Sequence, residues 1–176
     1  MCVQEEVDFL MSFFHERAKA DLDEIMRNEI RLSVMGDKLK LPESLQSLIS
    51  SAEEYTKANQ GLHMFLALNY GGRYDITAAS KKIATKVRDG VLQVEEINEA
   101  LFEQHLETSE IQVSNPDLLI RTSGEHRVSN FMLWQLAYSE LYFANKLFPD
   151  FDEDDFVEAL KMFQKRHRRY GGGHNK

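Results

Sequence analysis

The chain has 176 residues, of which 43% are hydrophobic and 28% charged, and its formal net charge is −8. Length and composition fit one globular domain, or a large part of one, and exclude pervasive disorder. The negative charge argues against nucleic-acid binding, the lack of an 18-residue apolar run excludes a membrane span, and the single cysteine, Cys2, excludes an internal disulfide framework.

Hydrophobic spacing in the first part of the chain predicts two helices alternating with two strands. We expect a long amphipathic helix from Glu5 to about Arg27, because apolar residues recur every three or four positions there. Residues 30–37 alternate with period two and close on Gly-Asp, which is typical of a strand and turn. A helix over about 42–59 follows. The uniformly apolar stretch 61–68 predicts a central strand covered on both faces.

The rest of the chain continues the alternation of helix and strand. We expect helices at 76–88, 94–105, 131–138 and 152–169, and strands at 118–120 and 141–143. Such alternation predicts a single α/β domain over residues 1–176, with a mainly parallel sheet and helices on both faces.

The segment from Arg121 to Asn130 follows a predicted strand, where ligands bind in open α/β sheets. Arginine guanidinium groups grip phosphate oxygens, and Gly124 allows close approach of the backbone. Ser129 lies at the expected start of the next helix, whose free N–H groups favour an anion. These residue types fit a diphosphate. They also fit a surface loop in which the arginines pair with Glu125 and Ser129 caps a helix.

Three weaker signals lie elsewhere. Asn69-Tyr70-Gly71-Gly72-Arg73 either presents backbone amides to a bound group or forms a turn. Glu140, among apolar neighbours, is either a ligand of a hard cation such as Mg²⁺ or a half-exposed residue at a helix end. Arg169 precedes a glycine tail that can fold over a phosphate. We expect the carboxyl ends of the strands to gather the following residues on one side: Asn69, Arg73, Arg121, Arg127 and Ser129.

From about Gln4 to Gly172 these motifs, in this order, resemble the cis-prenyltransferases, the family of undecaprenyl and dehydrodolichyl diphosphate synthases. The longest motif is DLLIRTSGEHRVSNFMLWQLAYSELYF; the others are VMGD, NYGGRYDI, FPDF and RRYGG. The amino-acid sequence of these motifs is similar to that of plant members. The resemblance implies an undecaprenyl diphosphate synthase-like fold and the condensation of isopentenyl diphosphate with an allylic diphosphate, assisted by Mg²⁺.

The resemblance also assigns roles to individual residues. It implies that the diphosphate of the isopentenyl substrate is bound by Arg121, Arg127, Val128 and Ser129, and that the metal site includes Glu140 and His126. Arg169 and Gly171 match a C-terminal motif that reaches the active site across a dimer interface. The partner is therefore expected to be a second copy or a related subunit.

One part of the family pattern is not found in this sequence. The strand and phosphate-binding loop with Met-Asp-Gly-Asn, which carry the metal-binding aspartate and the allylic site, do not occur. We therefore expect about the first third of the fold to be missing, assign no catalytic residue, and predict that the chain alone does not transfer prenyl groups. A non-catalytic interaction subunit is the alternative. The expected location is cytoplasm or, for a plant protein, plastid stroma, and the product is membrane-associated.

Overall fold

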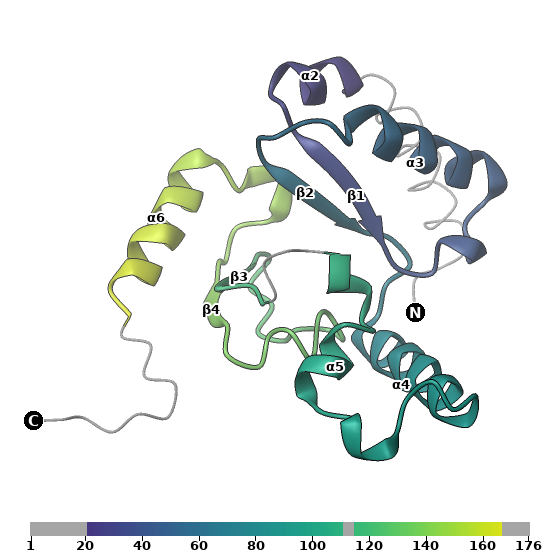
Figure 1. Cartoon of the computed structure of the whole chain (residues 1–176). Coiled ribbons are helices and arrows are strands. Elements are labelled where there is room, and N and C mark those ends of the chain that lie inside the picture. The colour runs from purple at the N-terminus through teal and green to yellow at the C-terminus, as the bar shows by residue number, and fades with distance from the viewer. Residues whose placement is uncertain (1–20, 111–114, 167–176) are drawn as a thin grey trace, which may run out of the picture. The chain divides into compact units, whose positions relative to one another are not determined.

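The computed structural model describes residues 21–110 and 115–166, which belong to two compact units, Met1–Tyr70 and Gly71–Lys176 (Figure 1). The described residues of each unit contain one pair of parallel strands together with helices. The predicted α/β fold with parallel strands and helices is confirmed. Within the described ranges the strands form two separate two-stranded sheets, where one sheet was expected.

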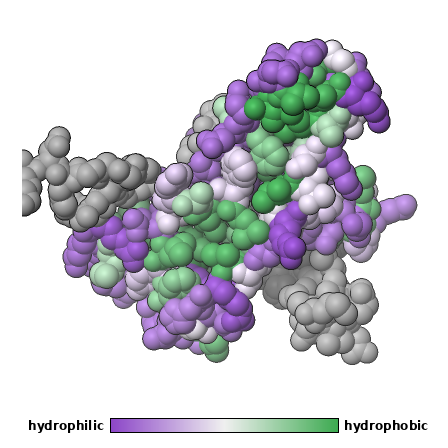
Figure 2. Space-filling model, turned by 90° about the horizontal axis from the view of Figure 1, so that it is seen from below, coloured by the Kyte–Doolittle hydropathy of each residue, from purple (hydrophilic) through white to green (hydrophobic). Residues whose placement is uncertain are grey.

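The surface is mixed in character. Figure 2 shows a face on which hydrophobic residues are exposed among hydrophilic ones. Large exposed hydrophobic side chains include Phe148, Phe156 and Leu160, the last two on a C-terminal helix. Among the residues that the structure describes, no helix combines the length and the apolar character that crossing a membrane requires.

The unit Met1–Tyr70 is a strand–helix–strand arrangement. Its strands pair in parallel from Arg31 opposite His63 to Met35 opposite Ala67. The described elements are α2 (Leu22–Arg27), β1 (Arg31–Met35), η1 (Lys38–Lys40), α3 (Glu43–Thr56) and β2 (His63–Ala67). Both predicted strands and the helix between them are confirmed. Most of the long helix expected from Glu5 lies outside the described residues.

The core of this unit lies between α3 and β1. Val34 of β1 packs with Leu41, Leu45 and Ile49, all buried, because one face of α3 carries apolar residues at helical spacing. β2 is less enclosed than predicted. Its side chains are half-buried or exposed, and in the described ranges it pairs with β1 alone.

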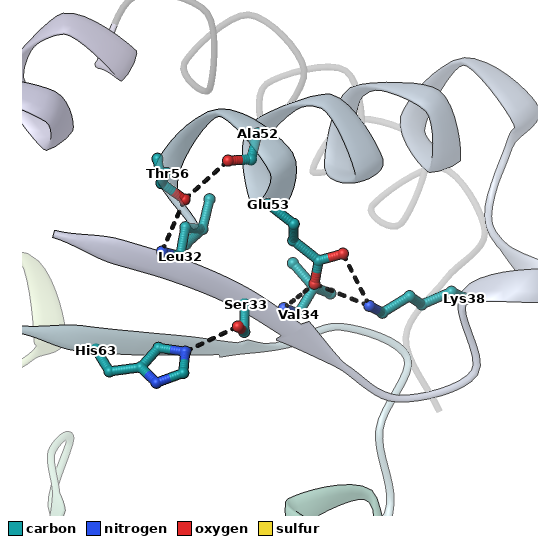
Figure 3. Close-up of polar contacts among 8 residues, drawn as sticks. All are labelled: Leu32, Ser33, Val34, Lys38, Ala52, Glu53, Thr56 and His63. Atoms are coloured by element: carbon teal, nitrogen blue, oxygen red, sulfur yellow. Dashed lines mark hydrogen bonds and ion pairs between the residues drawn. The ribbon is translucent and has the colours of Figure 1, made fainter. Parts of the chain in front are cut away.

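Side chains of α3 bind the edge of β1 that faces away from β2 (Figure 3). The hydroxyl of Thr56, fully buried, accepts a hydrogen bond from the Leu32 amide at 3.1 Å and donates one to the Ala52 carbonyl at 2.8 Å. The Glu53 carboxylate accepts from the Val34 amide at 2.7 Å. Two amides that have no partner in β2 are thus satisfied, as buried backbone groups must be.

Replacing Thr56 by valine keeps the side-chain shape and leaves the buried Leu32 amide without an acceptor. We expect a loss of about 1–3 kcal/mol in the free energy of unfolding, measured by urea denaturation. Thr77 is the matched control: its hydroxyl makes the same kind of bond to the carbonyl four residues earlier, is exposed, and accepts from no strand in the described residues. Equal losses in Thr56→Val and Thr77→Val would contradict the role of the strand amide.

We expect His63 to make the stability of this unit depend on pH. Its Nε2 lies 2.8 Å from the Ser33 hydroxyl oxygen, and its ring lies 4.0 Å from that of Phe65. Burial, followed by the charge of Arg31, lowers the pKa of His63 below its usual value of 6.5. The unfolded chain therefore takes up this proton at a higher pH than the folded chain does.

We expect the contribution of neutral His63 to the free energy of unfolding to be complete above pH 6.5. This contribution should be lost as the pH falls from there towards the lowered pKa of the folded chain. The urea midpoint of the wild type should decrease over this interval. His63→Gln, which cannot take up the proton, should show a smaller decrease. Parallel midpoint curves for the two proteins would contradict the assignment to His63.

The unit Gly71–Lys176 contains the second strand pair, in which Leu118 lies opposite Glu140 and Arg121 opposite Phe143. Its helices and strands are α4 (Gly72–Arg88), α5 (Glu99–Glu103), β3 (Leu118–Arg121), β4 (Glu140–Phe143) and α6 (Glu153–Gln164), with short 3-10 turns η2 (Val94–Glu96), η3 (Glu107–Glu110) and η4 (Phe148–Asp150). The helix expected over 94–105 is divided into η2 and α5, because the Asn98 side chain accepts from the Leu101 amide and begins a new helix.

The helix predicted over 131–138 is wrong: consecutive turns occupy this segment. Ser129, Asn130 and Met132 have φ angles of 47°, 64° and 44°. A right-handed helix requires negative φ, so these residues prevent a regular helix from starting. The apolar residues do recur at helical spacing, but the positive φ angles determine the backbone conformation of this segment.

A buried polar cluster anchors these turns to α4. Asp75 is 1% exposed, and its carboxylate accepts from the Glu107 amide at 2.9 Å and from the Gln135 side chain at 3.3 Å. The same Gln135 nitrogen lies 3.0 Å from the Thr108 hydroxyl. Because each of these buried groups is paired, the segment between β3 and β4 has a defined position against α4.

Candidate functional site: the loop after β3

The segments that leave β3 and β4 are hydrogen-bonded to each other. The Ala144 amide donates to the Arg121 carbonyl at 2.7 Å, the Ser123 amide to the Lys146 carbonyl at 2.7 Å, and the Gly124 amide to the Ala144 carbonyl at 2.9 Å. Ser123 and Gly124 have φ angles of 67° and 65°, which turn the chain back at the end of β3. The loop is therefore held at the carboxyl end of the strand pair, as predicted.

Lys146 connects this loop to the start of α6. Its ammonium group lies 2.6 Å from Asp155 and 3.5 Å from Asp152, the two residues of the capping box of α6. The hydrogen bond from Lys146 lowers the pKa of Asp155, and the same bond raises the pKa of Lys146. The loop, the exit of β4 and the first turn of α6 thus form one connected block.

The two arginines of the loop have different surroundings. Arg121 is half-buried at the end of β3, and its Nε is buried without a hydrogen-bond partner among the described residues. Arg127 is exposed and forms an ion pair with Glu125. A buried guanidinium nitrogen without a partner is costly, so a ligand oxygen at this place would be favourable. An exposed ion pair contributes little and is easily exchanged for a stronger anion.

Val128 and Ser129 continue the loop. Val128 is half-buried, and its carbonyl accepts from the Phe131 amide at 2.9 Å. Ser129 is exposed and has positive φ, so it caps no helix, contrary to the prediction that it starts one.

The two predicted metal ligands lie apart. The ring of His126 lies against that of Phe143, at the end of β4, with centroids 4.9 Å apart and planes tilted by 53°, whereas Glu140 begins β4. Glu140 instead forms an ion pair with Arg166 at 2.6 Å. In the described part of the chain no three His, Cys, Asp or Glu side chains form a group suited to a metal ion. The assignment of Glu140 and His126 to a Mg²⁺ site stays a prediction, and we assign no step to the metal.

The start of α4 lies against the end of the loop. The Gly72 amide donates to the Asn130 carbonyl at 2.6 Å, and the Arg73 amide to the Asn130 side-chain oxygen at 2.9 Å. The two amides that could have faced an anion are therefore occupied. The backbone of Arg73 thus contacts the end of the loop, and the gathering of its side chain with Arg121 and Arg127 stays a prediction.

The remaining predicted residues have mixed outcomes. Asn69 belongs to the other unit, where its side chain donates to the Asp37 carbonyl at 3.1 Å. Arg169 and Gly171 lie outside the described residues. Sequence reasoning missed Asn130. The only available signal was that asparagine tolerates positive φ better than most residues do.

The Glu140–Arg166 pair can be tested by a double-mutant cycle. Arg166 also donates to the Leu141 carbonyl at 3.0 Å, so the pair joins the end of α6 to β4. Because the pair is partly exposed, we expect Glu140→Gln and Arg166→Gln each to lower the free energy of unfolding by about 1 kcal/mol or less. The double variant should lose less than the sum. Strict additivity would show that the two side chains do not interact.

The chain matches known proteins over nearly its whole length. The family described as putative undecaprenyl diphosphate synthase matches residues 3–171. A chloroplastic (2Z,6Z)-farnesyl diphosphate synthase of Solanum lycopersicum is 56% identical over 96% of this chain, and dehydrodolichyl diphosphate synthase 2 of Arabidopsis thaliana is 51% identical over 95%. The chain spans 58% and 54% of the lengths of these two relatives.

The comparison with solved structures agrees. Lavandulyl diphosphate synthase from Lavandula x intermedia, in complex with dimethylallyl diphosphate, is 48% identical with a TM-score of 0.94, and the match covers 97% of this chain and 73% of that one. The predicted resemblance, including its similarity to plant members, is confirmed. With a family match from residue 3 to residue 171 and plant relatives sharing half of its residues or more, the chain belongs to the undecaprenyl diphosphate synthase family, the cis-prenyltransferases.

Proposed function

We propose that this chain carries the isopentenyl-diphosphate half of a cis-prenyltransferase active site. In the proposed reaction, a carbon–carbon bond forms between isopentenyl diphosphate and an allylic diphosphate. The carbon–oxygen bond of the allylic substrate breaks, and pyrophosphate leaves. The isopentenyl unit loses a proton, which restores a carbon–carbon double bond. The observation that carries the proposal is the loop after β3, which holds Arg121 with an unpartnered buried Nε and an exposed Arg127 at the carboxyl end of a parallel strand pair.

The roles of the loop residues follow from their surroundings. Arg121 is supported by β3 and would donate to one phosphate without losing an existing Nε bond. Arg127 would exchange Glu125 for a second phosphate, with which guanidinium bonds are stronger. The exposed Ser129 hydroxyl can add a neutral hydrogen bond. Together these groups neutralise a diphosphate locally, although the chain has a net charge of −8.

Other parts of the proposal rest on the family. Mg²⁺, the allylic substrate, a tail contribution from Arg169 and Gly171, and a partner that is a second copy or a related subunit all remain predictions. Exposed hydrophobic side chains on η4 and α6, such as Phe148 and Phe156, support an interaction with another subunit. The chloroplastic relatives support a location in the plastid stroma.

Arg127→Ala tests the diphosphate site. The purified chain should bind inorganic pyrophosphate in isothermal titration calorimetry. Arg127→Ala should weaken this binding about tenfold or more, because one charge-assisted bond contributes about 1.5–3 kcal/mol. Arg88 is the matched control, since it too is exposed and ion-paired with a neighbouring carboxylate, that of Asp89. Arg88→Ala should change the affinity less than twofold, about the scale of a surface charge effect.

A hybrid protein distinguishes a functional prenyltransferase half-site from a non-catalytic interaction subunit. Joining the N-terminal portion of the Solanum lycopersicum synthase to this chain should produce prenyl transfer if the half-site is functional. Arg127→Ala in the hybrid should raise KM for isopentenyl diphosphate far more than KM for the allylic primer. A folded but inactive hybrid would favour the non-catalytic interaction subunit. An equal rise in both constants would contradict the assignment of the loop to one substrate.

A further inference from the structure

Asn130 makes two contacts with the first turn of α4. Its backbone carbonyl accepts from the Gly72 amide at 2.6 Å, and its side-chain Oδ1 accepts from the Arg73 amide at 2.9 Å. The first amides of a helix have no partner within the helix. Gly71, the N-cap residue immediately before α4, offers no side-chain cap. A residue 57 positions further along the chain therefore caps α4.

The glycines of the motif make this contact possible. A Cβ atom on Gly71 would lie 2.7 Å from the Asn130 side-chain nitrogen, and a Cβ on Gly72 would lie 2.9 Å from the Leu133 amide nitrogen. Both distances are shorter than van der Waals contact. The Gly-Gly pair thus serves the close approach of α4 to the loop, which explains its place before Arg73.

Asn130 also suits the backbone that the loop requires. Its φ of 64° lies in the left-handed region, which asparagine adopts more readily than most residues do. Ser129, immediately before it, has a φ of 47°. The hydrogen bonds to α4 therefore fix Asn130 at the point where the loop leaves Ser129. One residue connects the backbone that presents Ser129 with the backbone that presents Arg73.

We propose that Asn130 is a positioning residue that holds the first turn of α4, with Arg73, beside the diphosphate-binding loop. The inference rests on the proposed function of that loop. Arg73 is exposed, and its own amide is one of the two that Asn130 caps. With α4 fixed by Asn130, the guanidinium of Arg73 adds a further positive charge for the diphosphate bound by Arg121 and Arg127. Asn130 itself acts through Arg73 and need not contact the substrate.

Two variants of Asn130 separate its side chain from its backbone conformation. Asn130→Gly keeps the positive φ and the backbone carbonyl, and removes the side-chain oxygen that accepts from the Arg73 amide. Asn130→Asp keeps an acceptor for the Arg73 amide. The matched control is Asn98→Gly, because Asn98 caps α5 in the same way, accepting from the Leu101 amide at 2.9 Å. Amide hydrogen exchange at Arg73 should accelerate in Asn130→Gly, remain close to wild type in Asn130→Asp, and be unaffected in Asn98→Gly.

Binding of inorganic pyrophosphate then tests the consequence for the site. Asn130→Gly and Arg73→Ala should each weaken binding by about three- to tenfold, the scale of one hydrogen bond. The double variant should be no weaker than Arg73→Ala alone, because Asn130 acts through Arg73. Asn98→Gly should bind as the wild type does.

The possible failures are distinct. If the wild type binds pyrophosphate and Asn130→Gly keeps full affinity, or if its effect adds to that of Arg73→Ala, the positioning role is overturned and the proposed function stands. Unchanged exchange at Arg73 in Asn130→Gly would also overturn it. If the folded wild type binds no pyrophosphate, the proposed function fails and the positioning role fails with it. In that case faster exchange in Asn130→Gly would identify Asn130 as a helix cap alone.

Discussion

The hydrogen bonds between the segments that follow β3 and β4 are the interaction on which the candidate site depends. A parallel pair of four-residue strands is short, and its exits would diverge without further contacts. The bond from the Ala144 amide to the Arg121 carbonyl extends the pairing beyond β4, and the bond from Ser123 to Lys146 folds the loop back. Arg121 is thereby fixed at the base of the loop. The attachment of Lys146 to α6 adds a third element to the same block.

Much of the fold was predictable because short-range patterns and long-range packing agree. β1, α3, β2 and α4 coincide with the predicted elements within a few residues, and Gly90, with a φ of 70°, lies just beyond the end of α4, as a helix-terminating glycine should. The segment after Asn130 was not predictable in the same way. Its apolar spacing favoured a helix, whereas its conformation is determined by positive φ angles and by the burial of Gln135 against Asp75.

The site shows a similar division. Arginines after a strand could be identified from residue types, and Arg121 and Arg127 lie in one loop as expected. The pairing of Glu140 with Arg166 joins residues 26 positions apart, and spacing alone gave no sign of it. The capping of α4 by Asn130 joins residues 57 positions apart. Contacts of this kind depend on tertiary structure, so the sequence indicates the chemical groups of the site more reliably than their partners.

The binding of β1 by α3 has a consequence for how the sheet can be extended. Thr56 and Glu53 occupy the amides of Leu32 and Val34, so a strand approaching β1 from that side would find these donors already bonded. The same side chains bury one of these contacts under the helix, where no second backbone could enter without displacing α3. Growth of this sheet is therefore directional. Any additional strand, from whichever chain it comes, must add beside β2.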